Sequence, residues 1–235
     1  MRVQADRVSV TGPHGTLLSP TSLTVSGGEL AIVHGEPGVG VTAFGLALAG
    51  RLKPATGTVT VDGGDPRKIV AIVDSPGVSE PDGALSLQVV VGEELELAKR
   101  PANKAAIASW LAEHDAAAFA TTRFENVAAV TRTRLLTELA ASREDVGVLV
   151  LDTPDRHTSD VDSWARLARE HAERGLAVIV LTATTPVSVL PEKPALCGAL
   201  EQPDPVRCAP VETPAETTLE ATVADDTDKT SGDQE

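Results

Sequence analysis

The chain has no tyrosine, and phenylalanine and tryptophan together make up only 2% of its 235 residues. A hydrophobic core must therefore be filled by Val, Leu, Ile and Ala, which favours β-branched strands and alanine-rich helices. The length allows one large domain or two small ones. We expect one domain followed by a tail, because the composition changes only near the end of the chain.

Positive charge is also scarce, since 20 Lys and Arg residues stand against 34 Asp and Glu, giving a formal net charge of -14. Binding to nucleic acid requires clustered basic side chains that neutralise phosphates. The basic residues here are spread thinly along the chain. The sequence therefore predicts no nucleic-acid partner.

Cysteine and long apolar runs are equally sparse. Cys197 and Cys208 lie late in the chain, without metal-ligand spacing to a histidine pair, which indicates a reducing compartment rather than a disulfide scaffold. No run approaches the roughly 18 apolar residues that a membrane-spanning helix needs, and the first ten residues contain no long apolar segment. We expect a cytosolic protein.

The residues that are present alternate between strand and helix patterns. Short alternating runs broken by Gly and Pro over residues 2–34 predict antiparallel strands with tight turns. A helix is expected after Thr42 and a strand over 57–65. Continuous apolar runs at 69–74, 146–152 and 176–182 are typical of strands buried on both faces. Further helices are predicted over 87–100, 102–119, 132–142 and 162–175. This order predicts a parallel sheet.

Residues 201–235 differ from the rest in composition. They hold ten acidic and two basic residues and almost no large apolar side chains. Such a segment buries too little surface to offset the entropy of ordering. We predict an acidic disordered tail from residue 201 onward.

The stretch GEPGVGVTAF, residues 35–44, follows the phosphate-binding pattern G-x-x-x-x-G-K-[ST] with Val41 in place of the lysine. Gly35, Gly40 and Thr42 fall on the fixed positions, and Gly38 adds a glycine suited to close backbone approach. The candidate nucleotide-binding residues are Gly35, Glu36, Pro37, Gly38, Val39, Gly40, Val41, Thr42 and Ala43. The alternative is a strand-to-helix turn retained only for packing.

The order of the sequence segments over roughly residues 1–190 resembles that in the ATP-binding subunit of an ABC transporter. The segment SLTVSGGELAIVHGEPGVGVT is followed by LKPATGTVTVDG, a helical insert and VLVLDTPD. The resemblance implies an α/β fold with a P-loop NTPase core of ABC type, an antiparallel β lobe and a helical lobe at about 84–135. The nucleotide-binding domain is then expected to span residues 1–200.

The same resemblance implies the ligands and partners. The glycine loop and the following helix N-terminus would face the phosphates of ATP, and Thr42 and Asp152 would hold Mg²⁺. Asp152 could instead be a structural cap at a strand end. The implied partners are a membrane-spanning transporter subunit and a second ATP-binding subunit, in a homo- or heterodimer. The implied location is cytoplasmic, at the inner face of the membrane.

Several positions depart from the family pattern. Thr153 stands at the catalytic glutamate, Ser75 at the glutamine that senses the γ-phosphate and Ala183 at the switch histidine. The signature position falls on AAVTR, residues 128–132, which has no glycine pair. His14 is the sole ring near the position of the adenine-stacking aromatic, and a turn histidine is more often solvated.

These departures, with the missing lysine, predict ATP binding with weak or absent hydrolysis, because a lost general base alone costs about 10² to 10⁴ in rate. The alternative is a pseudo-ATPase that binds no nucleotide and acts as scaffold or regulator of a membrane complex. Asp155, Asp160 and Asp162 follow the candidate metal ligand, and they could supply a substitute carboxylate. Helix capping is the more common role of such residues.

Overall fold

The structure is a computed structural model and describes residues 1–208 of the chain. Most of the predicted acidic tail therefore lies outside the described residues.

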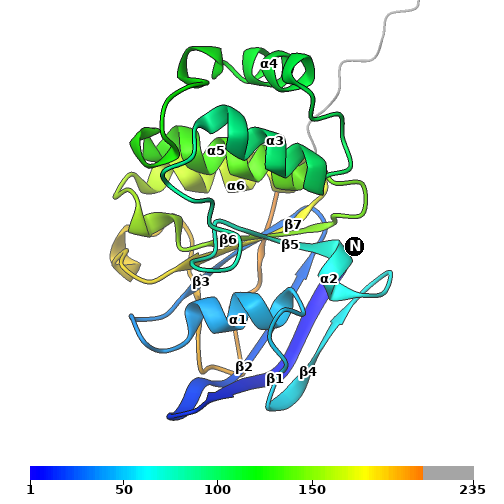
Figure 1. The fold of residues 1–235 in the computed structure, drawn as a ribbon. Coiled ribbons are helices and arrows are strands. Elements are labelled where there is room, and N and C mark those ends of the chain that lie inside the picture. The colour runs from blue at the N-terminus through cyan, green and yellow to red at the C-terminus, as the bar shows by residue number, and fades with distance from the viewer. Residues whose placement is uncertain (209–235) are drawn as a thin grey trace, which may run out of the picture.

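A parallel sheet forms the centre of the molecule (Figure 1). Its strands follow the order β5-β6-β7-β3-β8, and β9 pairs antiparallel with β3. The strands are β5 (Val70–Val73), β6 (Val148–Asp152), β7 (Ala177–Thr182), β3 (Glu29–His34), β8 (Ala195–Leu196) and β9 (Val206–Arg207). Every residue of β5, β6 and β7 is buried, as their continuous apolar sequences predict.

A second, antiparallel sheet has the order β2-β1-β4 and is formed by β1 (Arg2–Gly12), β2 (Gly15–Ser26) and β4 (Thr56–Val61). Helix α1 (Val41–Leu48) lies between the two sheets, and the short α2 (Pro66–Ile69) follows β4 (Figure 1). The prediction of antiparallel strands was right for the first two strands. It was wrong for β3, which pairs parallel with β7 because its apolar run is buried in the central sheet.

Helices α5 (Ala129–Ala141) and α6 (Val161–Glu173) cover the other face of the parallel sheet, opposite α1 (Figure 1). Helix α3 (Leu87–Leu97) contacts α5, and α4 (Lys104–Glu113) packs on α3, farther from the sheet. Short 3-10 turns occur at η1 (Ala117–Phe119), η2 (Phe124–Asn126), η3 (Pro154–Arg156) and η4 (Val187–Val189). One apolar cluster lies between these helices and the sheet, and a second one surrounds α1.

Two predicted helices differ from the structure at their ends. The helix expected over 102–119 stops at Glu113, because Asp115 takes a left-handed backbone conformation with φ 52°. Phe119 consequently lies on a 3-10 turn and is 45% exposed. The helix expected over 132–142 begins earlier, at Ala129. Trp110 and Trp164 are buried.

The folded part of the chain extends beyond residue 200. Residues 206–207 form β9, the Cys208 N–H donates to the Gly28 carbonyl at 2.8 Å, and Cys208 is buried in the helix-side core. Composition missed this segment because its anchors are a two-residue strand, the buried Cys208 and the Gln202 amide, which hydrogen-bonds to the backbone of Leu196 and Ala199. Cys197 and Cys208 are both free thiols, and burial raises the pKa of Cys197 to about 12.

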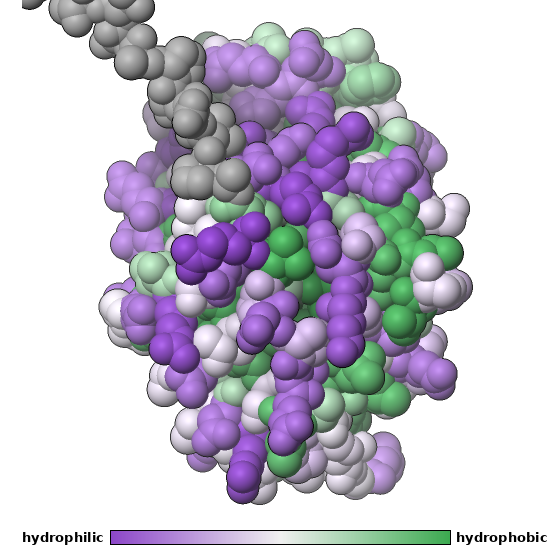
Figure 2. Space-filling view, turned by 180° about the vertical axis from the view of Figure 1, so that it is seen from behind, coloured by the Kyte–Doolittle hydropathy of each residue, from purple (hydrophilic) through white to green (hydrophobic). Residues whose placement is uncertain are grey.

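The face seen in Figure 2 is largely polar, with apolar side chains near its centre and along one side. Within residues 1–208, no helix combines the length and apolar character needed to cross a bilayer.

Candidate functional site

The glycine loop connects the end of β3 to the start of α1. The Gly35 N–H donates to the carbonyl of Thr182, the last residue of β7, at 3.1 Å. Gly38 and Gly40 both have left-handed backbones, with φ values of 94° and 93°. The loop therefore lies at the carboxyl edge of two neighbouring parallel strands, where ligands bind in open α/β sheets.

Gly40 is the most tightly constrained residue of the loop. A Cβ atom at this position would lie 2.1 Å from the Leu17 carbonyl oxygen of β2. Gly40 is also the N-cap of α1 and provides no side-chain cap, while its carbonyl accepts the N–H of Phe44 at 2.9 Å. The first-turn amides of α1 are therefore free of a capping side chain and favour an anionic acceptor.

Val41, which occupies the lysine position, is 5% exposed and packs in the core around α1. Its Cγ2 atom lies 2.8 Å from the place that a Cβ on Gly35 would take. The side chain thus fills space beside the loop rather than reaching out of it. The sequence revealed the missing charge, but not that the position is buried.

Asp152, the last residue of β6, accepts hydrogen bonds from three hydroxyl groups. Thr42 Oγ1 donates to Asp152 Oδ1 at 3.0 Å, and Ser75 Oγ donates to Oδ2 at 2.7 Å. Thr153 Oγ1 donates to Oδ1 at 3.3 Å. Three of the residues singled out in the sequence therefore meet on one carboxylate next to the glycine loop.

Burial raises the pKa of Asp152 above its ordinary value, and the hydrogen bonds from Ser75 and Thr42 oppose this effect. The carboxylate is 1% exposed. Hard oxygen atoms of a hydroxyl and a carboxylate are the ligands that Mg²⁺ prefers. Thr42 and Asp152 thus fit a Mg²⁺ ion, because the hydroxyl that donates to Asp152 keeps its own lone pairs for the metal.

Thr153 turns the chain sharply after β6. Its φ of 49° is left-handed, which is unfavourable for a β-branched residue. This turn folds Arg156 back onto the strand end, where its Nη1 donates to the Asp152 carbonyl at 2.8 Å and to Thr153 Oγ1 at 3.4 Å. A guanidinium therefore contacts the residues on both sides of the turn.

Ala183 lies just after β7, and its methyl side chain has no atom that could act as a ligand. Its N–H, together with those of Thr184 and Thr185, donates to Asp155 Oδ2 at 2.7–3.0 Å. Asp155 therefore orders the 183–185 turn instead of facing the loop. Asp160 is the N-cap of α6, accepting the N–H of Ser163 at 3.2 Å, as the capping interpretation expects.

The segment at the signature position, residues 128–132, forms the start of α5. Its first residues carry methyl and isopropyl side chains, and Val130 is 44% exposed. His14 lies in the exposed turn between β1 and β2.

A cluster of charged residues beside Ser75 was not found from the sequence. Arg132 of α5 donates to both carboxylate oxygens of Asp74, at 2.6 and 3.0 Å, and to Glu80 at 3.1 Å. Arg156 Nη2 lies 3.3 Å from Asp74 and 3.2 Å from Glu80, and His157 Nε2 lies 3.2 Å from Asp74. These residues come from separate segments, so no local spacing could predict the cluster.

Ligand atoms of Asp74, Glu80 and His157 lie within 4.8 Å of one another, which is a spacing that a metal ion could use. The two guanidinium groups already neutralise both carboxylates. Burial and the same two arginines lower the pKa of His157. We therefore assign this cluster to ion pairing rather than to metal binding.

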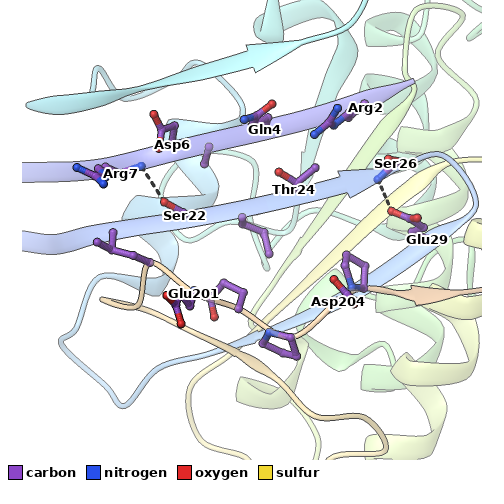
Figure 3. A pocket seen from close by; sticks show the side chains of 16 residues that line it. Arg2, Gln4, Asp6, Arg7, Ser22, Thr24, Ser26, Glu29, Glu201 and Asp204 are labelled. Carbon is purple, nitrogen blue, oxygen red and sulfur yellow. Dashed lines mark hydrogen bonds between the residues drawn. The ribbon is translucent and has the colours of Figure 1, made fainter.

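A polar cleft of about 730 Å³ lies between the β1–β2 face and residues 200–205 (Figure 3). Arg2 and Arg7 face it from β1, while Glu201 and Asp204 line the opposite side. No residue of the glycine loop lines this cleft. Its mixed charge does not select one class of ligand, so the candidate site remains the glycine loop with Asp152.

Known proteins similar to this chain were found by sequence and by structure. No protein-family model matches the chain. The hemin import ATP-binding protein HmuV of Rhodopseudomonas palustris is 29% identical over 197 residues, covering 76% of this chain and 72% of that protein.

Two solved structures share the fold. One, the ATP-binding subunit of an ABC transporter, has a TM-score of 0.58 at 15% identity and covers 78% of this chain and 80% of its own. The other, a protein from Pyrococcus furiosus assigned as an ABC transporter ATP-binding protein, has a TM-score of 0.58 at 19% identity, with coverages of 79% and 93%. The α/β fold with its antiparallel and parallel sheets and its helices is therefore confirmed.

Proposed function

We propose that the chain is an ATP-binding subunit of the ABC transporter type that binds Mg-ATP but hydrolyses it slowly or not at all. Its similarity to ATP-binding proteins of ABC transporters in sequence and in fold supports this proposal. The observation that carries the proposal is the meeting of Thr42, Ser75 and Asp152 beside the glycine loop. This arrangement supplies oxygen ligands for an ion next to backbone amides suited to phosphate.

In this proposal, the loop amides and the first turn of α1 hold the phosphates, while Thr42 and Asp152 hold Mg²⁺. The ion supplies neutralisation of the phosphate charge. Affinity is reduced by the absence of the lysine, which removes a charge contact of about 1 to 4 kcal/mol.

Slow turnover follows from the residues around Asp152. Thr153 has a neutral hydroxyl where a base is needed to orient an attacking water. Asp152 already accepts three hydroxyl groups, so it is not free to act as that base. Ser75 is bonded to Asp152 and cannot extend to the terminal phosphate in the way a longer amide side chain could.

The partners of the chain are proposed from its neighbours, because ATP-binding subunits of ABC transporters work with membrane-spanning subunits. We place the chain at the cytoplasmic face of the membrane, bound to such a subunit and paired with a second ATP-binding chain. Co-purification with the products of adjacent genes would test these partners, and recovery of a membrane permease would support them.

Thermal unfolding with Mg-ATP tests binding. A ligand at a hundred times its dissociation constant stabilises the folded state by about 2.7 kcal/mol, so the unfolding midpoint should rise with Mg-ATP. Thr153→Glu should then gain turnover in a phosphate-release assay without gaining affinity. Wild-type turnover as fast as that of a competent ATPase would contradict the slow-hydrolysis part.

The second candidate function is a scaffold or regulator that binds no nucleotide. It is favoured by the burial of Val41 and by the occupation of both Asp152 oxygens by protein hydroxyls. This candidate predicts an unfolding midpoint that Mg-ATP does not change at any reachable concentration. The two functions are thus separated by one titration.

A further inference from the structure

We propose that Arg156 supplies the phosphate-binding cation that the glycine loop lacks. This inference rests on the proposed function, since it concerns the same nucleotide site. It adds to that site a residue that lies four positions after Asp152 in the chain.

Arg156 is the cationic side chain that reaches the candidate site within residues 1–208. Its Nη1 is hydrogen-bonded to the Asp152 carbonyl and to Thr153 Oγ1, and Thr153 Oγ1 shares Asp152 Oδ1 with Thr42. One carboxylate oxygen and one hydroxyl therefore connect the guanidinium to the hydroxyl at the start of α1. A phosphate held beside Thr42 would lie within the range of this charge, because charges are poorly screened at partly buried sites.

The ion pairs around Arg156 leave it able to turn toward a phosphate. Its contacts to Asp74 and Glu80 are 3.3 and 3.2 Å, whereas Arg132 holds Asp74 at 2.6 and 3.0 Å and also holds Glu80. If Arg156 moves, both carboxylates keep Arg132 as a partner. The movement therefore leaves no buried charge unpaired. An unpaired buried charge is the usual cost of breaking such a cluster.

Arg156 and Arg132 differ in the solvent exposure of their side chains. The side chain of Arg156 is 20% exposed, whereas that of Arg132 is 9% exposed and lies over the Phe124 ring at 4.6 Å. Arg132 is held by the Phe124 ring and by its ion pairs, whereas part of the Arg156 side chain is accessible to solvent. A guanidinium binds phosphate through two N–H groups in a fork, so Arg156 suits an oxyanion ligand in chemistry as well as in position.

Calorimetric titration with Mg-ATP tests the inference through Arg156→Gln. Loss of a charge-assisted contact is expected to weaken binding roughly ten- to a hundredfold. Arg156→Lys keeps the charge and should retain most of the affinity. Arg143→Gln is the matched control, because it also removes one positive charge from a partly buried ion pair, with Glu94, and should bind like wild type.

The outcomes separate the two proposals. Wild-type binding with Arg156→Gln within twofold of it overturns the inference and leaves the proposed function standing. No binding by the wild type removes the proposed function, and the inference with it. Thermal unfolding without ligand shows whether each variant is folded.

Arginine labelling keeps the test decisive if Arg156→Gln fails to fold. Phenylglyoxal modifies accessible guanidinium groups, and mass spectrometry reports the extent at each arginine of the wild-type chain. Saturating Mg-ATP should protect Arg156 severalfold and leave Arg174, on the far end of α6, unchanged. Equal labelling of Arg156 with and without bound Mg-ATP would overturn the inference.

Discussion

Gly40 is the residue at which the glycine loop is least tolerant of change. An alanine there would combine a left-handed backbone with a Cβ placed 2.1 Å from the Leu17 carbonyl. Gly38 has almost the same φ but open space around it. The two glycines therefore form a natural pair for separating backbone strain from steric contact.

We expect Gly40→Ala to lower the free energy of unfolding by more than about 2 kcal/mol, because strain and overlap add. Gly38→Ala should cost about 1 kcal/mol from backbone strain alone. Urea denaturation of both variants measures the difference. Equal losses would show that Leu17 moves aside and that the loop is looser than its geometry indicates.

Asp152 is a residue whose proposed role as a Mg²⁺ ligand conflicts with the stability of the folded state. Burial raises its pKa above 3.8, so the native state holds the proton more tightly than the unfolded chain does. The contribution of this group to stability is therefore greatest at low pH and falls as pH rises from 3.8 through the raised pKa.

Asp152→Asn removes the buried charge while keeping a side chain that can pair with Thr42 and Ser75. At pH 7 the variant should unfold at a higher urea concentration than wild type, and this difference should shrink as the pH approaches 3.8. Any stabilisation by Mg-ATP should be lost. A variant less stable than wild type at pH 7 would mean that the hydrogen bonds to the carboxylate outweigh its burial.

At this scale the sequence predicted some contacts and missed others for clear reasons. The resemblance to ABC ATP-binding subunits implied that Thr42 and Asp152 lie close together, because both fall on positions of the family pattern. Arg132 and Asp74 are 58 residues apart and belong to no periodic pattern, so only the fold brings them together. The burial of Val41 was missed because a motif specifies residue types and not side-chain direction.

At the scale of elements, the long apolar strands were predicted and the short ones were not. β5, β6 and β7 are continuous apolar runs, and that pattern leaves little alternative to a buried strand. β8 and β9 have two residues each, too few for any period to appear. Helix ends were also misplaced, because a left-handed residue such as Asp115 is not evident from composition.

The segment 201–208 gives a prediction at this scale. A chain ending at Leu200 loses the β9–β3 pairing and the burial of Cys208. We expect it to be less stable by about 2 kcal/mol than a chain ending at Cys208, from lost hydrogen bonds and apolar burial. Urea denaturation of the two truncated chains compares them directly. Equal midpoints would show that the segment adds nothing to the fold.

At the scale of the whole molecule, Arg132 joins the helices to the sheet next to the candidate site. It links α5 to Asp74, which follows β5, and to Glu80 in the connection that leads to α3. Ser75, which bonds to Asp152, lies within that same connection. The position of the helices is therefore tied to the groups that would hold Mg²⁺.

Arg132→Met should lower the free energy of unfolding by about 3 kcal/mol, because removing one partner of a buried pair leaves the other poorly compensated. Arg174→Met is the control, since the Arg174 side chain is 49% exposed and its pair with Glu138 should be worth less than about 1 kcal/mol. Denaturant unfolding measures both. A small loss for Arg132→Met would mean that Arg156 and His157 can replace it.

Titration of the full-length chain with Mg-ATP in a calorimeter tests the central claim most directly, which is that backbone amides with Thr42 and Asp152 hold a triphosphate without the loop lysine. The account predicts saturable heat that is abolished in Asp152→Asn and unchanged in Arg143→Gln. Heat no greater than that of dilution at millimolar Mg-ATP would contradict it.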